Sequence, residues 1–146
     1  MSMLKVEKIA DGTVIDHIPA GKGLRVLQIL NIQAGYLGRV ALLMNTTSKK
    51  MGKKDIVKIA DKHIDDKTAD KIALIAPEAS LNIIKNFEVI EKRQVKLRSK
   101  LVAVAACPNP NCITNHERME SEFKVEERGI RCSYCERLFK PEELSA

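Results

Sequence analysis

The sequence predicts an α+β fold in two parts, an antiparallel sheet with two helices on one face followed by a small all-β domain. Hydrophobic residues make up 45% of the 146 residues, so a packed core is expected. Aromatic residues make up only 3%, so that core is expected to be aliphatic. Strand-like and helix-like apolar patterns follow one another through residues 1–98, and all four cysteines lie beyond them. We therefore expect a domain boundary near residue 98.

Apolar alternation and β-branched runs predict six strands and two helices in residues 1–98. The expected strands span residues 4–9, 13–18, 39–44, 55–60, 81–84 and 87–90. One helix is expected from Gly21 to Ile32 and a second over residues 68–76, with Asp65 and Asp66 as capping carboxylates and Pro77 as its stop. Strands and helices in this order are typical of a ferredoxin-like layer, with both helices on one face of the sheet.

Two polar, basic runs predict irregular segments. Residues 45–54 are an expected loop, and residues 91–100, which carry five cations, are an expected strand end and linker. Beyond the linker, short strands are expected at residues 101–104 and 120–126. A domain of about fifty residues buries too little apolar surface to fold securely alone. A further source of stability is therefore expected in residues 99–146.

The four cysteines have the spacing of a structural zinc site. Cys107 and Cys112 form a C-x4-C pair, and Cys132 and Cys135 form a C-x2-C pair. Such pairs bring two thiolates from each of two loops to one metal ion. Four protein sulfurs fill a tetrahedron, so we expect one structural Zn²⁺ per chain in a zinc-ribbon-like domain, with no open position for catalysis.

Other interpretations of the cysteines are weaker. Two disulfides would suit a secreted domain, but the sequence shows no N-terminal signal pattern. A redox C-x-x-C would leave Cys107 and Cys112 unexplained. His116 lies near the first cysteine pair and is an alternative ligand, although four sulfurs already complete the tetrahedron.

Charge is distributed unevenly between the two parts. Residues 1–98 hold 18 Lys and Arg against 11 Asp and Glu, a net charge of +7. Residues 99–146 hold 7 against 8, a net charge of −1, which four thiolates on one divalent ion make more negative. The basic part is therefore the one suited to an anionic ligand. The cysteine-bearing part is poorly suited to nucleic-acid backbones.

Signatures of catalysis are missing from the sequence. It contains no P-loop, no G-x-G-x-x-G motif and no serine or cysteine in the setting of an activated nucleophile. His17 beside Asp16 could act as a general base in a small enzyme, but no nucleophile accompanies it. No apolar run is long enough to span a bilayer. We expect a non-enzymatic cytoplasmic protein that does not contact membranes.

Four segments together resemble the regulatory chain of aspartate carbamoyltransferase. They are G-T-V-I-D-H-I-P-A at 12–20, M-G-K-K-D-I-V-K-I at 51–59, A-P-E-A-S-L-N-I-I at 76–84, and the two cysteine motifs. They occur in the order of that family and cover nearly the whole chain. The run 31–50 shows no clear match, and Phe87 stands where the family can have Tyr.

The resemblance implies an allosteric subunit without an active site. Residues 1–98 would bind CTP and ATP, with UTP as a further candidate, and would form the homodimer. Residues 99–146 would hold zinc and contact the catalytic chain. The expected assembly is a dodecamer of two catalytic trimers and three regulatory dimers, in pyrimidine nucleotide biosynthesis.

The resemblance also assigns site residues. Asp16 matches the residue that binds the ribose hydroxyls, Lys58 one near ribose and base, and Lys92 one on the phosphates. The strand whose backbone meets the base is matched by Val6, Glu7, Lys8 and Ile9. Other pocket positions are matched by His17, Lys54, Asn82, Ile84 and Val89.

Asn109 and Asn111 match the loop that faces the catalytic chain, although both could merely serve the turn between the cysteines. The alternative function is a zinc-ribbon protein that binds nucleic acid or takes part in transcription, and the acidic balance of residues 99–146 argues against it.

Overall fold

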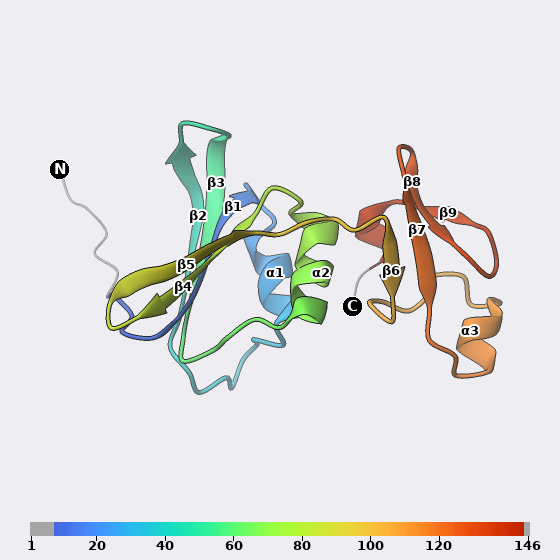
Figure 1. Cartoon of the computed structure of the whole chain (residues 1–146), viewed down its shortest axis with the longest axis horizontal. Helices are drawn as coiled ribbons and strands as arrows, with labels where there is room; N and C mark the ends of the chain where they lie inside the picture. The colour runs from blue at the N-terminus through green and yellow to red at the C-terminus, as the bar shows by residue number, and fades with distance from the viewer. Residues whose placement is uncertain (1–7, 145–146) are drawn as a thin grey trace.

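A five-stranded antiparallel sheet forms the first part of the chain (Figure 1). The computed structural model describes residues 8–144. The strands are β1 (Gly12–Pro19), β2 (Val40–Ser48), β3 (Gly52–Ala60), β4 (Ser80–Lys85) and β5 (Glu88–Gln94). Their order in the sheet is β2-β3-β1-β4-β5, in which the first four strands have the ferredoxin-like arrangement and β5 is added at one edge. The predicted α+β class is confirmed.

Two helices, α1 (Gly23–Ile29) and α2 (Asp66–Ile75), lie on one face of this sheet. The carboxylate of Asp65 caps α2 by accepting a hydrogen bond from the Thr68 backbone N–H at 2.8 Å, as the sequence predicted. Helix α1 is shorter than the sequence suggested. It ends at Ile29 because the chain turns at Leu30 and Asn31, and Asn31 has a left-handed φ of +58°.

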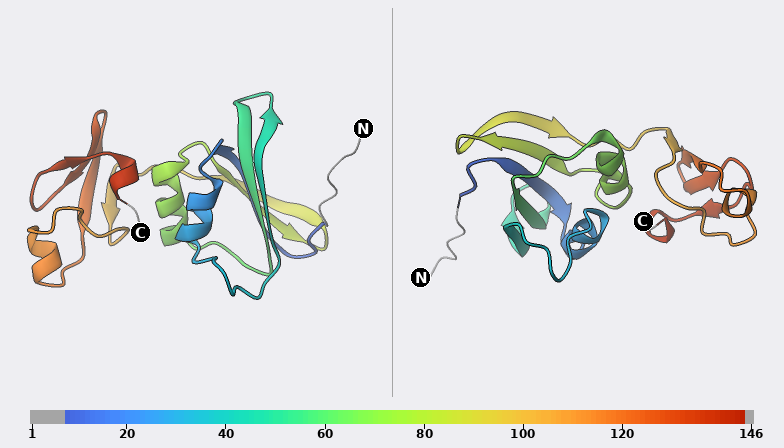
Figure 2. Two further views of the ribbon diagram at one scale, coloured as in Figure 1. Left: turned by 180° about the vertical axis from the view of Figure 1, so that it is seen from behind. Right: turned by 90° about the horizontal axis from the view of Figure 1, so that it is seen from below.

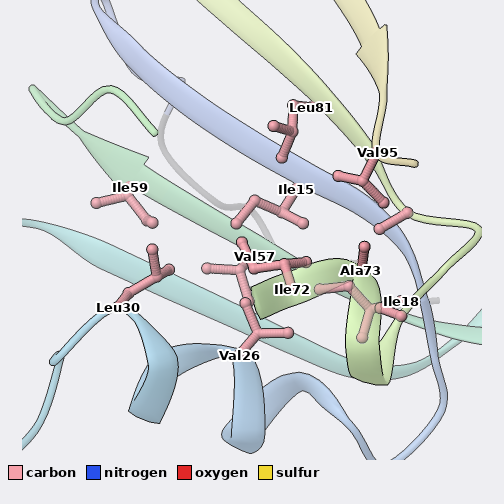
Figure 3. Close-up of a cluster of buried hydrophobic side chains, with 12 residues drawn as sticks. Ile15, Ile18, Val26, Leu30, Val57, Ile59, Ile72, Ala73, Leu81 and Val95 are labelled. Atoms are coloured by element: carbon pink, nitrogen blue, oxygen red, sulfur yellow. The ribbon is translucent and has the colours of Figure 1, made fainter. Parts of the chain in front are cut away.

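The core between sheet and helices is aliphatic, as expected. Ile15, Val57 and Leu81 point from three adjacent strands toward Val26 of α1 and Ile72 of α2 (Figure 3). All five side chains are buried. Because alternate residues of a strand point to opposite faces, the remaining strand residues line a face that the two helices do not cover.

One predicted loop is wrong, and one predicted strand lies mostly outside the described residues. The segment 45–54 is not a loop, because β2 continues to Ser48 and β3 begins at Gly52. Thr46 and Thr47 pair across this hairpin with Lys54 and Lys53, and an exposed edge hairpin accepts polar side chains in its strands. Most of the strand expected at residues 4–9 lies outside the described residues, and Lys8 and Ile9 are not in a strand.

The second part is a smaller four-stranded antiparallel sheet. Its strands β6 (Lys100–Val102), β7 (Glu122–Glu126), β8 (Gly129–Cys132) and β9 (Leu138–Phe139) lie in the order of the chain. A single-turn helix α3 (Ile113–His116) and a 3-10 turn η1 (Pro141–Glu143) complete it. Its core combines Leu101, Phe123 and Ile130 with three of the cysteines. The prediction of a small β domain is confirmed, and the short helix is an addition to it.

The two helices lie between the two sheets, and α2 packs toward both (Figures 1 and 2). Ile72 and Ala73 belong to the core of the first part, whereas Leu74 belongs to the core of the second. An ion pair of 3.1 Å between Arg98 and Asp70 ties the linker to the same helix. None of the described helices has the length and apolar character needed to cross a membrane.

Leu74→Ala should lower the free energy of unfolding by about 2–5 kcal/mol, because it leaves a cavity where α2 meets the second core. Chemical denaturation would measure the loss. Leu24→Ala is the matched control, since Leu24 is 55% exposed on α1 and its removal should change little. Equal stabilities of the two variants would contradict the packing described.

Candidate functional site

The four cysteines converge on one point of the second part. Their sulfur atoms all lie within 4.8 Å of one another. The Sγ atoms of Cys107 and Cys135 are 3.8 Å apart, and those of Cys112 and Cys132 are 3.7 Å apart. A tetrahedron with Zn–S bonds of about 2.3 Å has edges of about 3.8 Å. The four sulfurs therefore fit a single zinc ion, and the predicted cluster is confirmed.

Local hydrogen bonds hold the first cysteine loop in shape. The side-chain amide of Asn115 donates to the carbonyls of Cys107 and Asn109, at 3.0 and 2.8 Å. The Asn109 side-chain oxygen accepts from the Asn111 backbone N–H at 3.0 Å. Asn109 thus serves the turn, whereas Asn111 is exposed. His116 is exposed on α3 and does not belong to the group of four sulfurs.

Burial raises the pKa of the Cys107 and Cys132 thiols. Zinc binds thiolates, so an ion entering the site must displace protons from these sulfurs. Metal binding by the four cysteines therefore weakens as the pH falls.

A charged cluster lies on the helix-free face of the first sheet, at one end of β1. The Lys54 ammonium lies 3.0 Å from Asp16 Oδ1 and 3.2 Å from Oδ2. The same carboxylate accepts from the His17 backbone N–H at 2.6 Å. The His17 Nδ1 atom lies 3.1 Å from the hydroxyl of Ser80 on β4. A β-bulge between Ile15 and Ile18 and a φ of +59° at His17 create this arrangement.

Two opposing effects act on the pKa of the Asp16 carboxyl. Burial raises it, but the hydrogen bonds from Lys54 and from the His17 backbone outweigh burial and lower the pKa below its ordinary value. Asp16 is therefore ionised at neutral pH, and its oxygens face a cation and an N–H donor.

Strand register aligns further predicted site residues in one row across the sheet. Val14 of β1 pairs with Lys58 of β3 on one side and with Asn82 of β4 on the other, and Asn82 pairs in turn with Lys92 of β5. Lys92 is exposed, whereas Asn82 is buried and its Oδ1 has no hydrogen-bond partner. The row thus presents two cations and an unsatisfied acceptor on the helix-free face.

A small cavity of about 110 Å³ adjoins this row. It is lined by Lys8, Ile9, Val14, Lys58, Ile84 and Phe87. Val89, on the strand after Phe87, pairs with Ile84 at its edge. Val6 and Glu7, which the sequence placed in the same site, lie outside the described residues.

The structure brings most of the predicted positions together and adds two. Lys8, Ile9, Lys58 and Ile84 share the cavity, and Asp16, His17 and Lys54 form the charged cluster. Val14 and Ser80 were missed. The period-two pattern of β1, which places Val14 on the same face as Asp16, could have indicated the first. The pairing of Asp16 with Ser80 across strands shows only in the fold.

Both parts of the chain match one protein family. Residues 4–96 match the family described as "Aspartate carbamoyltransferase regulatory chain, allosteric domain". Residues 99–145 match the family described as "Aspartate carbamoyltransferase regulatory chain, metal binding domain". The second match agrees with the four converging sulfurs and with a structural zinc ion.

Relatives that carry the name aspartate carbamoyltransferase regulatory chain align over nearly their full length. The protein of Thermococcus gammatolerans is 46% identical over 147 residues, covering 99% of this chain and 97% of the relative. That of Pyrococcus abyssi is 48% identical over 152 residues, covering 100% and 99%. That of Korarchaeum cryptofilum is 50% identical over 146 residues, covering 97% and 93%.

These matches do not favour a nucleic-acid-binding zinc ribbon, because both parts of the chain, and not the cysteine motif alone, follow one family. The catalytic chain of the same enzyme of pyrimidine biosynthesis is the partner that a regulatory chain implies. The chain therefore belongs to the family of aspartate carbamoyltransferase regulatory chains, which are non-catalytic subunits.

Proposed function

We propose that this chain binds nucleoside triphosphates on the helix-free face of its first sheet and transmits their binding to catalytic chains held by its zinc domain. The allosteric domain would comprise residues 1–98 and the zinc domain residues 99–146. CTP and ATP are the proposed effectors, with UTP as a further candidate. The observation that carries this proposal is the row of Lys58, Val14, Asn82 and Lys92 beside the Asp16–Lys54 pair.

The chemistry of this row suits the parts of a nucleotide. The Asp16 carboxylate can accept hydrogen bonds from both ribose hydroxyls. Lys92 is exposed and can approach the phosphates, and Lys54 and the His17 backbone contact the Asp16 carboxylate. The buried Oδ1 of Asn82 lacks a donor, which a bound nucleotide can supply.

The base would lie in the cavity at the other end of the row. Val14, Ile84 and Phe87 give it apolar walls, and Val89 lies beside them. Lys58 borders both the cavity and the row, consistent with a position near ribose and base. We assign the backbone of Val6, Glu7, Lys8 and Ile9 to recognition of the base edge.

The proposed assembly uses other surfaces. The loop between Cys107 and Cys112, which zinc makes rigid, would face the catalytic chain. Asn111 would contact that chain, and Asn109 would support the loop. Edge strand β2 would join a second copy, because it ends the sheet and the adjoining Leu37 is fully exposed. Three such dimers would join two catalytic trimers in a dodecamer. Four reduced thiols suit the cytoplasm.

Lys92→Ala should weaken CTP and ATP binding about 10- to 100-fold, the effect of losing a charge-assisted hydrogen bond to phosphate. Isothermal titration calorimetry of the full chain measures this directly. Lys124→Ala, which removes an exposed lysine from β7 of the other sheet, is the control and should bind normally. Absence of CTP and ATP binding in the unmodified chain would rule out the proposed function.

Removing zinc should abolish assembly with the catalytic chain. Chelation, or Cys132→Ser, should unfold the zinc domain and release the catalytic chain, because the metal supplies much of the stability of so small a core. Native mass spectrometry would record zinc content and assembly mass, and Ser133→Ala is the neighbouring control. Stable assembly with the catalytic trimer by zinc-free protein would contradict the assignment.

Asn111→Ala should weaken assembly with the catalytic trimer and leave the CTP affinity of the isolated chain unchanged. Its side chain is exposed on the first cysteine loop. The part of the chain that carries this loop lies on the opposite side of the helices from the five-stranded sheet (Figure 1). Analytical ultracentrifugation with the catalytic trimer and calorimetry with CTP test the two halves of this expectation. Reduced CTP affinity in the isolated variant would place Asn111 in a different role.

A further inference from the structure

We propose that Asp55, a buried carboxylate on the helix-covered face of β3, is a positioning residue that holds Asp16 and Lys54 in place on the opposite face. This inference rests on the proposed function, since those two residues belong to the proposed nucleotide site. It adds a residue that does not itself touch the nucleotide.

Asp55 is fully buried, with an exposed fraction of 0%, and it is bonded to backbone only. Its Oδ2 accepts from the N–H groups of Gly21 and Gly23, at 3.0 and 2.8 Å, and its Oδ1 accepts from that of Asn45 at 2.9 Å. In the described part of the chain no cation lies within ion-pair distance of it. One carboxylate therefore joins the start of α1 to strand β2.

The two strands that flank β3 are both irregular beside Asp55. Strand β2 has a β-bulge between Leu43 and Thr46, in which Asn45 has a φ of +58°. Strand β1 has the bulge between Ile15 and Ile18 described above, and Asp55 pairs with Ile18 where that bulge ends. Asp55 thus lies on the strand between two bulges: its Oδ1 is bonded within the β2 bulge, its Oδ2 is bonded to the segment that follows β1, and its backbone pairs with Ile18 at the end of the β1 bulge.

Lys54 depends on the same arrangement. As the neighbour of Asp55 along the strand, it points to the opposite, helix-free face. Its backbone pairs with Pro19 on one side and with Thr46 on the other, just beyond each bulge. The β1 bulge contains Asp16, the ion-pair partner of Lys54. The separation of this carboxylate and ammonium is therefore set by the two bulges.

The space around Asp55 is shaped for a carboxylate. A Cβ atom on Gly23 would lie 2.9 Å from Asp55 Oδ2 and 2.5 Å from a methyl group of Leu42, so any larger residue there must displace these side chains. Burying an unpaired carboxylate costs free energy, and an apolar residue would leave three N–H groups unsatisfied. The three hydrogen bonds to Asp55 therefore fix one backbone geometry, as a binding site requires.

Asp55→Asn tests the inference with little change in shape. The amide oxygen can still accept from Gly21 and Gly23, but the amide NH₂ then faces the N–H of Asn45, and two donors oppose each other. The β2 bulge should loosen and the Lys54–Asp16 pair should relax. We expect CTP binding to weaken about tenfold in the full chain, comparable to the loss of one charge-assisted hydrogen bond.

The Asp16 carboxyl gives a second readout that a general loss of stability does not affect. Its pKa is lowered by the hydrogen bond from Lys54, so its titration midpoint, followed by carboxyl NMR, should rise toward the ordinary value in Asp55→Asn. Val57→Ala is the control, since Val57 is a fully buried core residue on the same strand. It should destabilise the fold without moving this midpoint.

Gly23→Ala is the second variant, and it tests the inference if Asp55→Asn fails to fold. The added methyl group leaves the Asp55 carboxylate in the chain but displaces it from its position. It should raise the Asp16 midpoint and weaken CTP binding in the same direction. An Asp16 midpoint that is unchanged in the folded variants would overturn the inference. This outcome is distinct from failure of the proposed function, in which the unmodified chain binds no nucleotide although the midpoint still shifts.

Discussion

The structure depends on helix α2 burying apolar side chains in two directions. Ile72 and Ala73 enter the core under the five-stranded sheet, while Leu74 enters the core around the cysteines. The helix layer therefore lies between the two sheets (Figure 1). The proposed nucleotide site lies on the far face of the first sheet, and the metal centre lies beyond the helices. Within one chain, the packed helices and the linker from β5 are the direct connections between the two sites.

The linker offers a covalent route between the sites. Lys92, on the proposed phosphate side, is followed by Val95, which is buried in the first core, and by Arg98, which pairs with Asp70 of α2. A displacement of β5 by bound phosphate would therefore act on the same helix that supports the zinc domain. The proposed coupling between effector and catalytic chain would use an element of this kind, which contacts both parts.

The zinc domain shows how a small core is made sufficient. Leu101, Phe123 and Ile130 bury too little apolar area to hold four short strands by themselves. The sulfur cluster closes two loops at one point, and Asn115 and Asn109 bond the first of these loops internally. A partner surface built on such a loop is rigid before the partner arrives, which reduces the entropic cost of association.

The sequence by itself determined the α+β class, the aliphatic core, the cap at Asp65 and the four zinc ligands, because each depends on local periodicity or on short spacing. It also nominated Asp16, Lys58 and Lys92, through segments that resemble one family. Only the tertiary structure decided which nominated residues meet. The row from Lys58 to Lys92 exists because β1 and β4 lie between β3 and β5, strands distant along the chain. The hairpin at 45–54 and the buried Asp55 were not predicted for a related reason. Polar residues in a sequence indicate a loop or an exposed position, whereas here cross-strand pairing and backbone N–H donors from other elements satisfy them within the fold.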